Sequence, residues 1–301
     1  MVDQIKISII IPVYNYAEKL PRAVNSVLKQ LAGQHELIVI DDGSTDNTQE
    51  VLLEIQKKSQ EFRVIYKENG GAASARNRGI VEACANYLIF LDADDELDEN
   101  ALNYIEKHIE KNPLSKVIIG GYTSVWPCGI KRKVSLPVAL SNDHVARVKS
   151  YLIDKTISLA NGATVMHRSI FDKGLYPERF RNAEDLPVFA QALGNFDCSI
   201  IEQSIALIHK HDDSLRHNAT YDKEVGLDLV NEIFNTNRLS DEFGSLKNQF
   251  LTQRALSLFR GYYAAGLNQE AKEMYRIALK TDFKSIFKWS YTRKAIRLIF
   301  K

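Results

Sequence analysis

Four acidic residues follow directly after one apolar run of this 301-residue chain. The run, residues 87–91, has the composition of a buried strand. The acids are Asp92, Asp94, Asp95 and Glu96. Carboxylates this close repel one another, and each is costly to bury beside an apolar strand. Oxygen ligands from Asp92 and Asp94 would suit one Mg²⁺ or Mn²⁺ ion, which would turn the repulsion into coordination. The alternative is an ordinary turn in which Asp94 and Asp95 cap a helix expected over 97–109.

A second acidic pair, Glu184 and Asp185, stands at the expected start of a helix in RNAEDLPVF (181–189). A positioned carboxylate can remove the proton of an attacking hydroxyl group. Acids in the first turn of a helix also stabilise the helix dipole without any catalysis, and Asn182 or a neighbour could cap the same helix. The pair is therefore a candidate general base with a competing structural explanation.

Short apolar runs alternate with amphipathic segments through the first part of the chain. Strands are expected over 5–13, 36–40, 62–66 and 87–91, and helices over 18–31, 48–60 and 72–85. This alternation predicts a mostly parallel sheet that is covered by helices on both faces. Ligands of such sheets bind beyond the carboxyl ends of the strands. Polar segments follow all four strands, at 14–15, 41–46, 69–71 and 92–95, so one sheet edge should hold the site.

Two familiar phosphate-binding motifs are missing from the sequence. The first strand is followed by YNYAEK (14–19), without the glycines of a dinucleotide-binding turn, and no P-loop pattern occurs. A bound nucleotide would therefore need another source of positive charge, and a divalent cation held by carboxylates is the obvious one.

The net charge, the cysteines and the length of the apolar runs limit the classes to which this protein can belong. The net charge is +1, which gives no electrostatic reason to expect nucleic acid as a partner. Cys84, Cys128 and Cys198 are odd in number and lack metal-binding spacing, which favours a reducing, cytoplasmic setting. We expect neither a signal peptide nor a membrane-spanning segment, because the first apolar run is short and leads straight into a strand.

The second half is less regular. Its expected elements are strands over 117–125 and 199–208, a helix over 145–152, a solvated loop over 131–133, and a loop, strand and helix start within 159–171. From Glu224 onward the pattern is helical, and 262–283 resembles a single tetratricopeptide helix pair. One such hairpin cannot bury its own apolar face, so we expect it to pack on the body of the protein or on a partner.

The C-terminal stretch 283–301 is basic and amphipathic. It has no acidic residue, and apolar and aromatic residues recur at roughly helical spacing between its lysines and arginines. That pattern favours a helix lying on an anionic membrane surface. A terminal helix that docks on the protein with a basic outer face explains it equally well.

Five segments, in order, resemble the family-2 glycosyltransferases of the GT-A fold. They are IIIPVYN (9–15), VIDDGSTDNT (39–48), NGGAASARNRGI (69–80), IFLDADDE (89–96) and AEDLPVF (183–189). The likeness extends no further than about Arg216. It implies a GT-A-type, Rossmann-like, mostly parallel α/β sheet with flanking helices, followed here by an all-α C-terminal extension. We expect a nucleotide-sugar-binding half over 1–115, an acceptor-binding half over 116–217 and the extension over 218–301.

The resemblance implies roles in binding the nucleotide. Pro12 and Tyr14, with Asn15 beside them, would line the nucleobase pocket. Asp42 would accept a hydrogen bond from the base, while Asp41 supports the loop. The residues expected near the ribose and the diphosphate are Gly70, Gly71, Ala73, Arg76 and Asn77. A structural ion pair is an alternative role for Arg76.

The resemblance also separates the four acids after the fourth strand. Asp94 would be the principal ligand of Mn²⁺ or Mg²⁺, and Asp92, with Ala93, would contact the ribose or metal-bound water. Asp95 and Glu96 would serve the loop and the next helix. His211, in HDDSL (211–215), would close over the diphosphate or the metal, with His209 and His217 as competitors. Candidates for contact with the sugar or acceptor are Trp126, Asn161 and His167.

The implied chemistry is inverting transfer of a sugar from a nucleoside-diphosphate sugar, most simply a UDP-sugar. Asp185 would act as the base, and Glu184 would orient it or bind the acceptor. The expected acceptor is a glycan or a lipid-linked glycan of the cell envelope, met at the cytoplasmic face of the membrane. One alternative is a sugar-nucleotide-binding scaffold without turnover. Another is a nucleotidyltransferase, although the glycine- and lysine/arginine-rich loop usual in such enzymes is absent.

Overall fold

The computed structural model describes residues 6–32, 34–127, 132–210 and 223–299. Its strands are β1 (Ile7–Val13), β2 (His35–Asp41), β3 (Phe62–Tyr66), β4 (Tyr87–Phe90), β5 (Glu96–Leu97), β6 (Val117–Val125), β7 (Arg132–Ser135), β8 (Thr164–His167) and β9 (Cys198–His209). Its α-helices are α1 (Leu20–Leu28), α2 (Thr48–Lys58), α3 (Ala72–Glu82), α4 (Ala101–Lys111), α5 (His144–Leu152), α6 (Asp185–Asn195), α8 (Asp228–Ile233), α9 (Gly244–Ala264), α10 (Asn268–Thr281) and α11 (Trp289–Ile299). Short 3₁₀ helices are η1 (Asn161–Ala163), η2 (Arg168–Asp172), η4 (Asp241–Phe243) and η5 (Phe283–Phe287).

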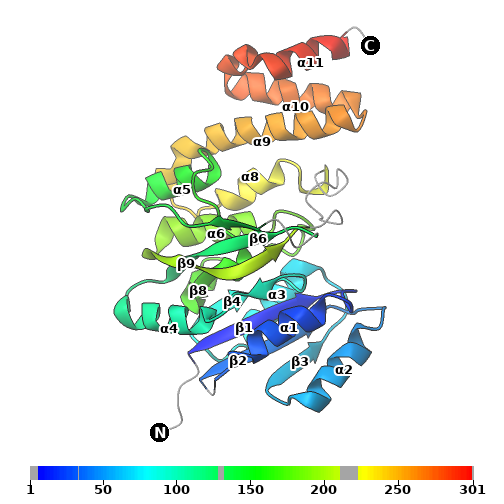
Figure 1. Ribbon diagram of the computed structural model, residues 1–301. Coiled ribbons are helices and arrows are strands. Elements are labelled where there is room, and N and C mark those ends of the chain that lie inside the picture. The colour runs from blue at the N-terminus through cyan, green and yellow to red at the C-terminus, as the bar shows by residue number, and fades with distance from the viewer. Residues whose placement is uncertain (1–5, 33, 128–131, 211–222, 300–301) are drawn as a thin grey trace.

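One sheet runs through the molecule in the order β3-β2-β1-β4-β8-β6-β9-β5, and β7 pairs with β6 (Figure 1). Strands β1 to β4 are mutually parallel. Strand β8 is antiparallel to both β4 and β6, so β6 and its parallel neighbour β9 point the same way as β4. The expected α/β sheet is confirmed, and six of its strands have their carboxyl ends at one edge.

The packing of β1 shows why this sheet has two helical layers. Ile9 and Ile11 are fully buried among apolar residues of α1 and α4, whereas Ile10 is fully buried among residues of α3 and α6. Successive side chains of a strand point to opposite faces, so a continuous apolar run is stable only when both faces are covered. Two buried apolar clusters, one on each face, stabilise the sheet and thereby position the edge from which the polar loops emerge.

The expected helix over 97–109 begins only at Ala101. The residues before it form β5, a short strand that pairs antiparallel with β9. Asp94 and Asp95 therefore do not cap this helix, and the acidic loop is held at both ends by the sheet. A strand this short has no periodicity of its own, so the sequence pattern could not separate it from the helix.

The prediction of a loop over 131–133 is also wrong for the residues that the structure describes. Arg132 and Lys133 are exposed but belong to β7, which pairs antiparallel with the end of β6, while Lys131 lies outside the described residues. Charged side chains are common on strands at the edge of a sheet, because they discourage pairing with other chains. Such a strand lacks the apolar alternation by which strands are predicted.

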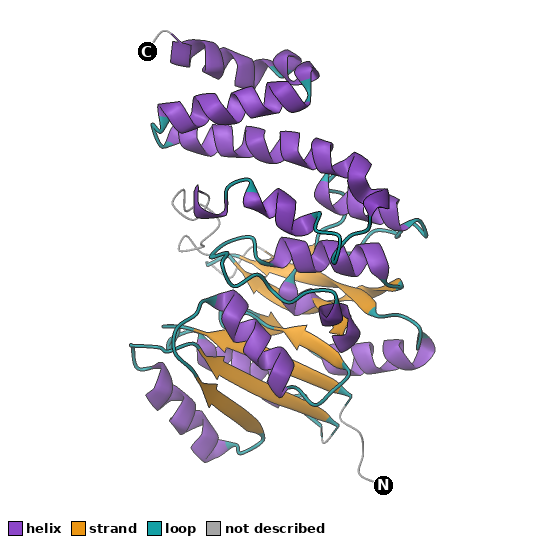
Figure 2. Ribbon diagram, turned by 180° about the vertical axis from the view of Figure 1, so that it is seen from behind, coloured by secondary structure: helices purple, strands orange, loops and turns teal. Residues whose placement is uncertain are grey.

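The C-terminal extension is a stack of helices beyond the sheet (Figures 1 and 2). Helices α9 and α10 form a hairpin, which turns at Gly266 with φ of 75°. The helix pair expected over 262–283 therefore begins earlier, because its first helix starts at Gly244 and only its last residues fall in that range. Ala271 and Ala278 of α10 are fully buried against α9, and α11 buries Leu298 in the same cluster as Ala271. Within the described residues, no helix is both long enough and apolar enough to cross a membrane.

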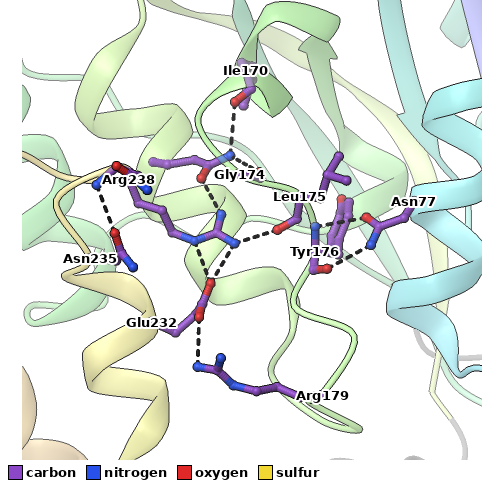
Figure 3. A network of polar contacts seen from close by, with 11 residues as sticks. Asn77, Ile170, Gly174, Leu175, Tyr176, Arg179, Glu232, Asn235 and Arg238 are labelled. Carbon is purple, nitrogen blue, oxygen red and sulfur yellow. Dashed lines mark hydrogen bonds and ion pairs between the residues drawn. The ribbon is translucent and has the colours of Figure 1, made fainter.

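A buried network joins the extension to the body of the protein (Figure 3). Arg238 is 6% exposed, and its guanidinium donates to Gln191 of α6 and, over 2.6 Å, to the carbonyl oxygen of Leu175. It also pairs at 2.8 Å with Glu232 of α8, which binds Arg179 at 2.8 Å through its second oxygen. Helix α8 is thereby fixed to the segment that leads into the Glu184–Asp185 pair.

Candidate active site

The polar loops meet at the edge formed by the carboxyl ends of the strands. Strand β1 lies between β2 and β4, so its loop is at the point where the strand order reverses, which is where ligands of open α/β sheets bind. Trp126 follows β6 and η1 precedes the antiparallel β8, so both lie at this edge. His167 ends β8 at the opposite edge, where its ring meets Tyr87 edge-on at a centroid distance of 5.2 Å. His167 is therefore no longer a candidate.

Asn15 locks the first loop to the second. Its Oδ1 accepts hydrogen bonds from the backbone nitrogens of Thr45 (2.7 Å) and Asp46 (3.3 Å), and its own backbone nitrogen donates to Ser44 Oγ (3.0 Å). The backbone of Asn15 is left-handed, with φ of 54°, which asparagine tolerates better than most residues. Its neighbour Tyr14 is 43% exposed, so the ring is free to pack against a base.

Asp42 holds the second loop to the third. One carboxylate oxygen accepts from Lys67 Nζ (2.6 Å) and from the backbone nitrogen of Gly70 (3.0 Å). The other accepts from the backbone nitrogen of Gly71 (2.6 Å). The residue is 2% exposed, so a hydrogen bond to a base would come in addition to these bonds. Asp41 accepts at 3.0 Å from the backbone of its own loop, which confirms its supporting role.

Several residues expected at the substrate have structural contacts. Ala73 and Ala93 are 2% and 6% exposed, so their methyl groups pack in the core rather than facing a ligand. Asn77 is also buried, and its side chain both donates to and accepts from the backbone of Tyr176, at 2.9 and 3.0 Å (Figure 3). A ligand contact by Asn77 would have to break these bonds. Pro12 is half-buried in β1, beside the loops that are expected to bind the nucleotide.

Arg76 joins the two acidic motifs. Its guanidinium donates to Asp92 Oδ1 at 2.8 Å and to Glu184 Oε1 at 2.6 Å, and it lies over the ring of Tyr176 at 5.4 Å. The side chain is 5% exposed; burial alone would lower its pKa, but Asp92 and Glu184 outweigh burial and raise the pKa. Of the two roles considered for Arg76, the structure shows the ion pair. The pair connects Asp92 and Glu184, which are far apart in the sequence.

Acidic groups outnumber the cations around the loop after β4. Burial raises the pKa of Asp92, and the nearby Asp94 raises it further. Burial, Asp92 and Asp94 together raise the pKa of Asp95 to about 8. Burial is the largest cause of both shifts, and the repulsion between the carboxylates adds to it; a divalent cation bound here would relieve that repulsion.

The residues present fit a hard cation that is only partly enclosed by protein. In the part of the chain that the structure describes, no three His, Cys, Asp or Glu side chains gather closely enough to hold a metal ion by themselves. Asp94 and Asp92 would supply two oxygens, and water or a diphosphate would supply the rest, as is usual for Mg²⁺. His211, expected to join them, lies outside the described residues.

Asp95 and Glu96 serve β9 rather than α4. Asp95 Oδ1 accepts from the backbone nitrogen of His209 at 2.8 Å, and Glu96 Oε1 lies 2.7 Å from His209 Nε2. Glu96 also pairs with Arg22 of α1, and Arg22 donates to the carbonyl oxygen of Asp94. His209 is thereby engaged in fixing the acidic loop, which leaves it a structural role.

The catalytic candidates Glu184 and Asp185 begin α6, as expected. Glu184 is its N-cap residue, without a side-chain capping bond, so the proposed capping role of Asn182 is not seen. Ala183, directly before the pair, has a left-handed backbone with φ of 59°. Burial and the neighbouring Glu184 raise the pKa of Asp185 to about 6. A carboxylate that gains a proton only near pH 6 is still ionised at neutral pH and is a stronger base than an ordinary aspartate.

Sequence reasoning overlooked two side chains at this site. Lys67 holds Asp42, and Tyr176 lies beneath Arg76 with a buried hydroxyl that has no hydrogen-bond partner among the described residues. Lys67 directly follows the third strand, so its position at the carboxyl end was a usable signal. Tyr176 lies in an irregular segment, and nothing in the local pattern distinguishes it.

Comparison with known proteins agrees with this geometry. The family model described as Glycosyl transferase family 2 matches residues 8–176, more than half of the chain. The chain therefore belongs to glycosyltransferase family 2.

Two relatives illustrate the range of similarity. An uncharacterized glycosyltransferase of Rickettsia felis is 36% identical over 180 residues, which are 60% of this chain and 29% of the relative. The poly(ribitol-phosphate) β-N-acetylglucosaminyltransferase TarP of Staphylococcus aureus is 36% identical over 174 residues, which are 56% of this chain and 50% of TarP. The chain spans only 25–30% of the length of three curated relatives that it matches.

A solved structure extends the likeness in fold to almost the whole chain. The crystal structure of S. aureus TarS 1–349 superposes with a TM-score of 0.68 at 19% identity and covers 97% of this chain and 88% of its own. The shared architecture is a GT-A-like α/β sheet with flanking helices, and it includes the helical C-terminal region.

Proposed function

We propose that this protein is an inverting glycosyltransferase that moves a sugar from a UDP-sugar to a hydroxyl group of a cell-envelope glycan or lipid-linked glycan. The observation that carries the proposal is the bridge made by Arg76. It places Asp92, in the candidate cation loop, beside Glu184, in the candidate base motif. A transferase needs these two functions on either side of one anomeric carbon. A plain binding protein has no need to join them.

The residues divide the work as follows. Tyr14 packs on the base and Asp42 accepts a hydrogen bond from it, while Gly70 and Gly71 lie against the ribose and the diphosphate. Asp94, with Asp92, holds Mn²⁺ or Mg²⁺, which when bound stabilises the negative charge of the departing nucleoside diphosphate. These assignments keep residues 1–115 as the donor half and 116–217 as the acceptor half.

Asp185 removes the proton from the acceptor hydroxyl as it attacks the anomeric carbon from the face opposite the leaving group. Glu184, fixed by Arg76, orients the acceptor beside it. Trp126, directly after β6, extends the same edge toward the acceptor half. His211, which lies outside the described residues, stays a proposed contact of the diphosphate or the metal. A single displacement inverts the configuration, and no covalent enzyme nucleophile is required.

The donor and acceptor classes are supported by related proteins. TarP is named for transfer of N-acetylglucosamine to poly(ribitol phosphate), and TarS has been crystallised with UDP-GlcNAc. A GalNAc transferase that matches 74% of this chain with a TM-score of 0.53 was solved with UDP and Mn²⁺. We therefore propose a UDP-N-acetylhexosamine or UDP-hexose as donor, and action at the cytoplasmic face of the cell membrane.

A panel of nucleotide sugars tests the proposal. The purified protein is incubated with UDP-, GDP- and dTDP-sugars in Mn²⁺, and the thermal unfolding midpoint and slow donor hydrolysis are measured. A UDP-sugar should raise the midpoint and be hydrolysed. Donor binding with neither hydrolysis nor transfer to any of a wide set of acceptors would favour the scaffold alternative. Release of pyrophosphate from UTP and a sugar phosphate would favour the nucleotidyltransferase.

We also propose that the C-terminal tail, 283–301, contacts an anionic membrane. Helix α11 docks on α9 and α10 through Ala295 and Leu298, as expected for a terminal helix that packs on the protein. Three aromatic side chains of the tail remain exposed: Phe283 (67%) and Phe287 (79%) of η5, and Trp289 (67%) of α11. Lys284 and Lys288 are exposed among them. Aromatic rings beside cations suit the interface of an anionic bilayer.

A vesicle experiment tests the tail apart from the enzyme. The intact protein should sediment with phosphatidylserine-containing vesicles and not with pure phosphatidylcholine. Replacing Phe287 and Trp289 by serine should abolish sedimentation while leaving donor binding intact, because both lie outside the packed core. Equal sedimentation of the wild type and the double variant would remove the membrane proposal without touching the catalytic one.

A further inference from the structure

Arg181 lies across the third polar loop, although it comes from the segment that precedes the catalytic pair. A side-chain carbon added to Gly71 would overlap Arg181 Nη1, and the guanidinium carbon would be 3.3 Å away. Gly71 has φ of 90° and is the N-cap residue of α3, so its missing side chain gives both the backbone and Arg181 the room that they need. The two loops touch at this point.

The neighbours of Arg181 explain why its side chain points there. Phe180 is 3% exposed and anchors the segment in the core. Arg179 is tied outward to Glu232 on α8 at 2.8 Å. With these two side chains fixed, Arg181 emerges on the side of α3 and the glycine loop, three positions before Glu184.

The charge of Arg181 is not used by the protein. Lys67 is paired with Asp42, and Arg76 is paired with Asp92 and Glu184. The guanidinium of Arg181 is exposed and makes no hydrogen bond or ion pair with any residue in the described ranges. A free guanidinium at the edge of a nucleotide pocket offers several N–H donors in a planar fork that matches phosphate oxygens.

We propose that Arg181 binds the diphosphate of the sugar nucleotide and so links donor binding to the position of the catalytic pair. The inference rests on the proposed function, since it takes the glycine loop as the diphosphate side of the donor. The start of α3 adds to the attraction, because it carries no acidic residue in its first turn and no capping side chain. A phosphate on the acceptor could supply the same chemistry, but the contact with Gly71 places Arg181 on the donor loops.

The contact has a consequence for turnover. The negative charge of the diphosphate increases as the bond to the sugar breaks, so a cation placed there stabilises the leaving group more than the intact donor. Because Arg181 is in the same short segment as Glu184 and Asp185, donor binding would also fix the position of the general base, Asp185. The role is one of binding and positioning, and an empty donor site would leave Arg181 free to move.

A comparison of UDP with uridine tests this contact, because both ligands carry the nucleobase and the ribose but only UDP carries the diphosphate. Isothermal titration is done with the full chain, with Mg²⁺ and again in EDTA, for the wild type, Arg181→Ala, Arg181→Lys and the control Arg179→Ala. Arg181→Ala should weaken UDP binding about ten- to a hundredfold in both buffers, as expected for lost charge-assisted hydrogen bonds. Uridine binding should not change. Arg181→Lys should recover part of the loss, and Arg179→Ala should bind like the wild type.

Each other outcome has a definite meaning. Equal UDP affinity in Arg181→Ala and the wild type overturns the inference while the proposed function stands. A wild type that binds no UDP-sugar refutes the proposed function itself. If Arg181→Ala keeps its UDP affinity but raises the KM of a phosphate-bearing acceptor, the cation serves the acceptor and the donor assignment is wrong. A change in the thermal midpoint, measured in parallel, would identify a folding effect, which is not expected for an exposed side chain.

Discussion

The guanidinium of Arg76 lies 2.6 Å from the carboxylate of Glu184, a residue 108 positions further along the chain. The same guanidinium holds Asp92, so one buried cation sets the distance between the acidic loop and the start of α6. Neither motif could keep its place without it, because the carboxylates would repel each other.

Replacing Arg76 by methionine should therefore damage both stability and catalysis. The buried carboxylates of Asp92 and Glu184 would lose their partner, and removing one member of a buried ion pair costs about 3–5 kcal/mol. We expect a lower urea midpoint and almost no sugar transfer. The matched control is Arg78→Met, since Arg78 is exposed on the same helix and pairs only with Glu82 among the described residues. Similar losses in the two variants would contradict the bridging role.

Asp94→Asn tests the cation site. A neutral amide is a poorer ligand for a hard cation, so transfer should fall by on the order of 100-fold or more, and extra Mn²⁺ should restore part of it. EDTA should abolish activity of the wild type, and added Mn²⁺ should restore it. Glu99→Gln, an exposed position just after the loop, is the control. Full activity of the wild type in EDTA would end the metal proposal.

The pH dependence of kcat/KM should report Asp185. The residue acts as a base only when ionised, and burial and Glu184 raise its pKa to about 6. Activity should therefore be constant above that pH and fall tenfold per pH unit well below it. A limb near pH 4, the ordinary range of an aspartate, would show that another group is the base. Asp185→Asn should lower kcat by about 10²- to 10⁴-fold while leaving UDP binding unchanged.

Arg238→Met should uncouple the helical extension from the body. Gln191, Glu232 and the carbonyl oxygen of Leu175 would lose a common partner in a buried site, at a cost of about 3 kcal/mol or more. The thermal midpoint should fall, and limited proteolysis should cut near α8. Arg179→Ala removes the exposed pair with the same Glu232 and a contact with the ring of Phe180, and should cost about 1 kcal/mol or less. Equal stability of both variants would count against the network.

The sheet was predictable from the sequence because its signals are local. The limits of β3 are those expected, and β1, β2 and β4 differ by one or two residues at their ends, since β-branched runs bounded by polar turns define them. The two-residue strand β5 was missed because β9, the strand with which it pairs, lies about a hundred positions later. Strands of this kind are set by their partner and not by their own residues.

The site was predictable in outline for a similar reason. The carboxyl-end rule gathers Asn15, Asp42, Gly71 and Asp94 at one edge before any contact is known. It does not say that Asn15 and Asp42 bind other loops, or that Asn77 holds Tyr176. Such pairings depend on which side chains meet after the chain has folded, and a single sequence contains no information about them beyond charge and size.

The pairing of β4 with β8, and of β8 with β6, has a consequence for how the molecule can move. Backbone hydrogen bonds run without a break from β1 through β4 and β8 to β6, so the described part of the sheet offers no hinge about which residues 6–115 and 116–210 could close on a substrate. Opening a cleft between them would break the central ladder and expose both buried clusters. Any gating during the reaction cycle should therefore come from the loops at the sheet edge and not from a change in the pairing of these strands.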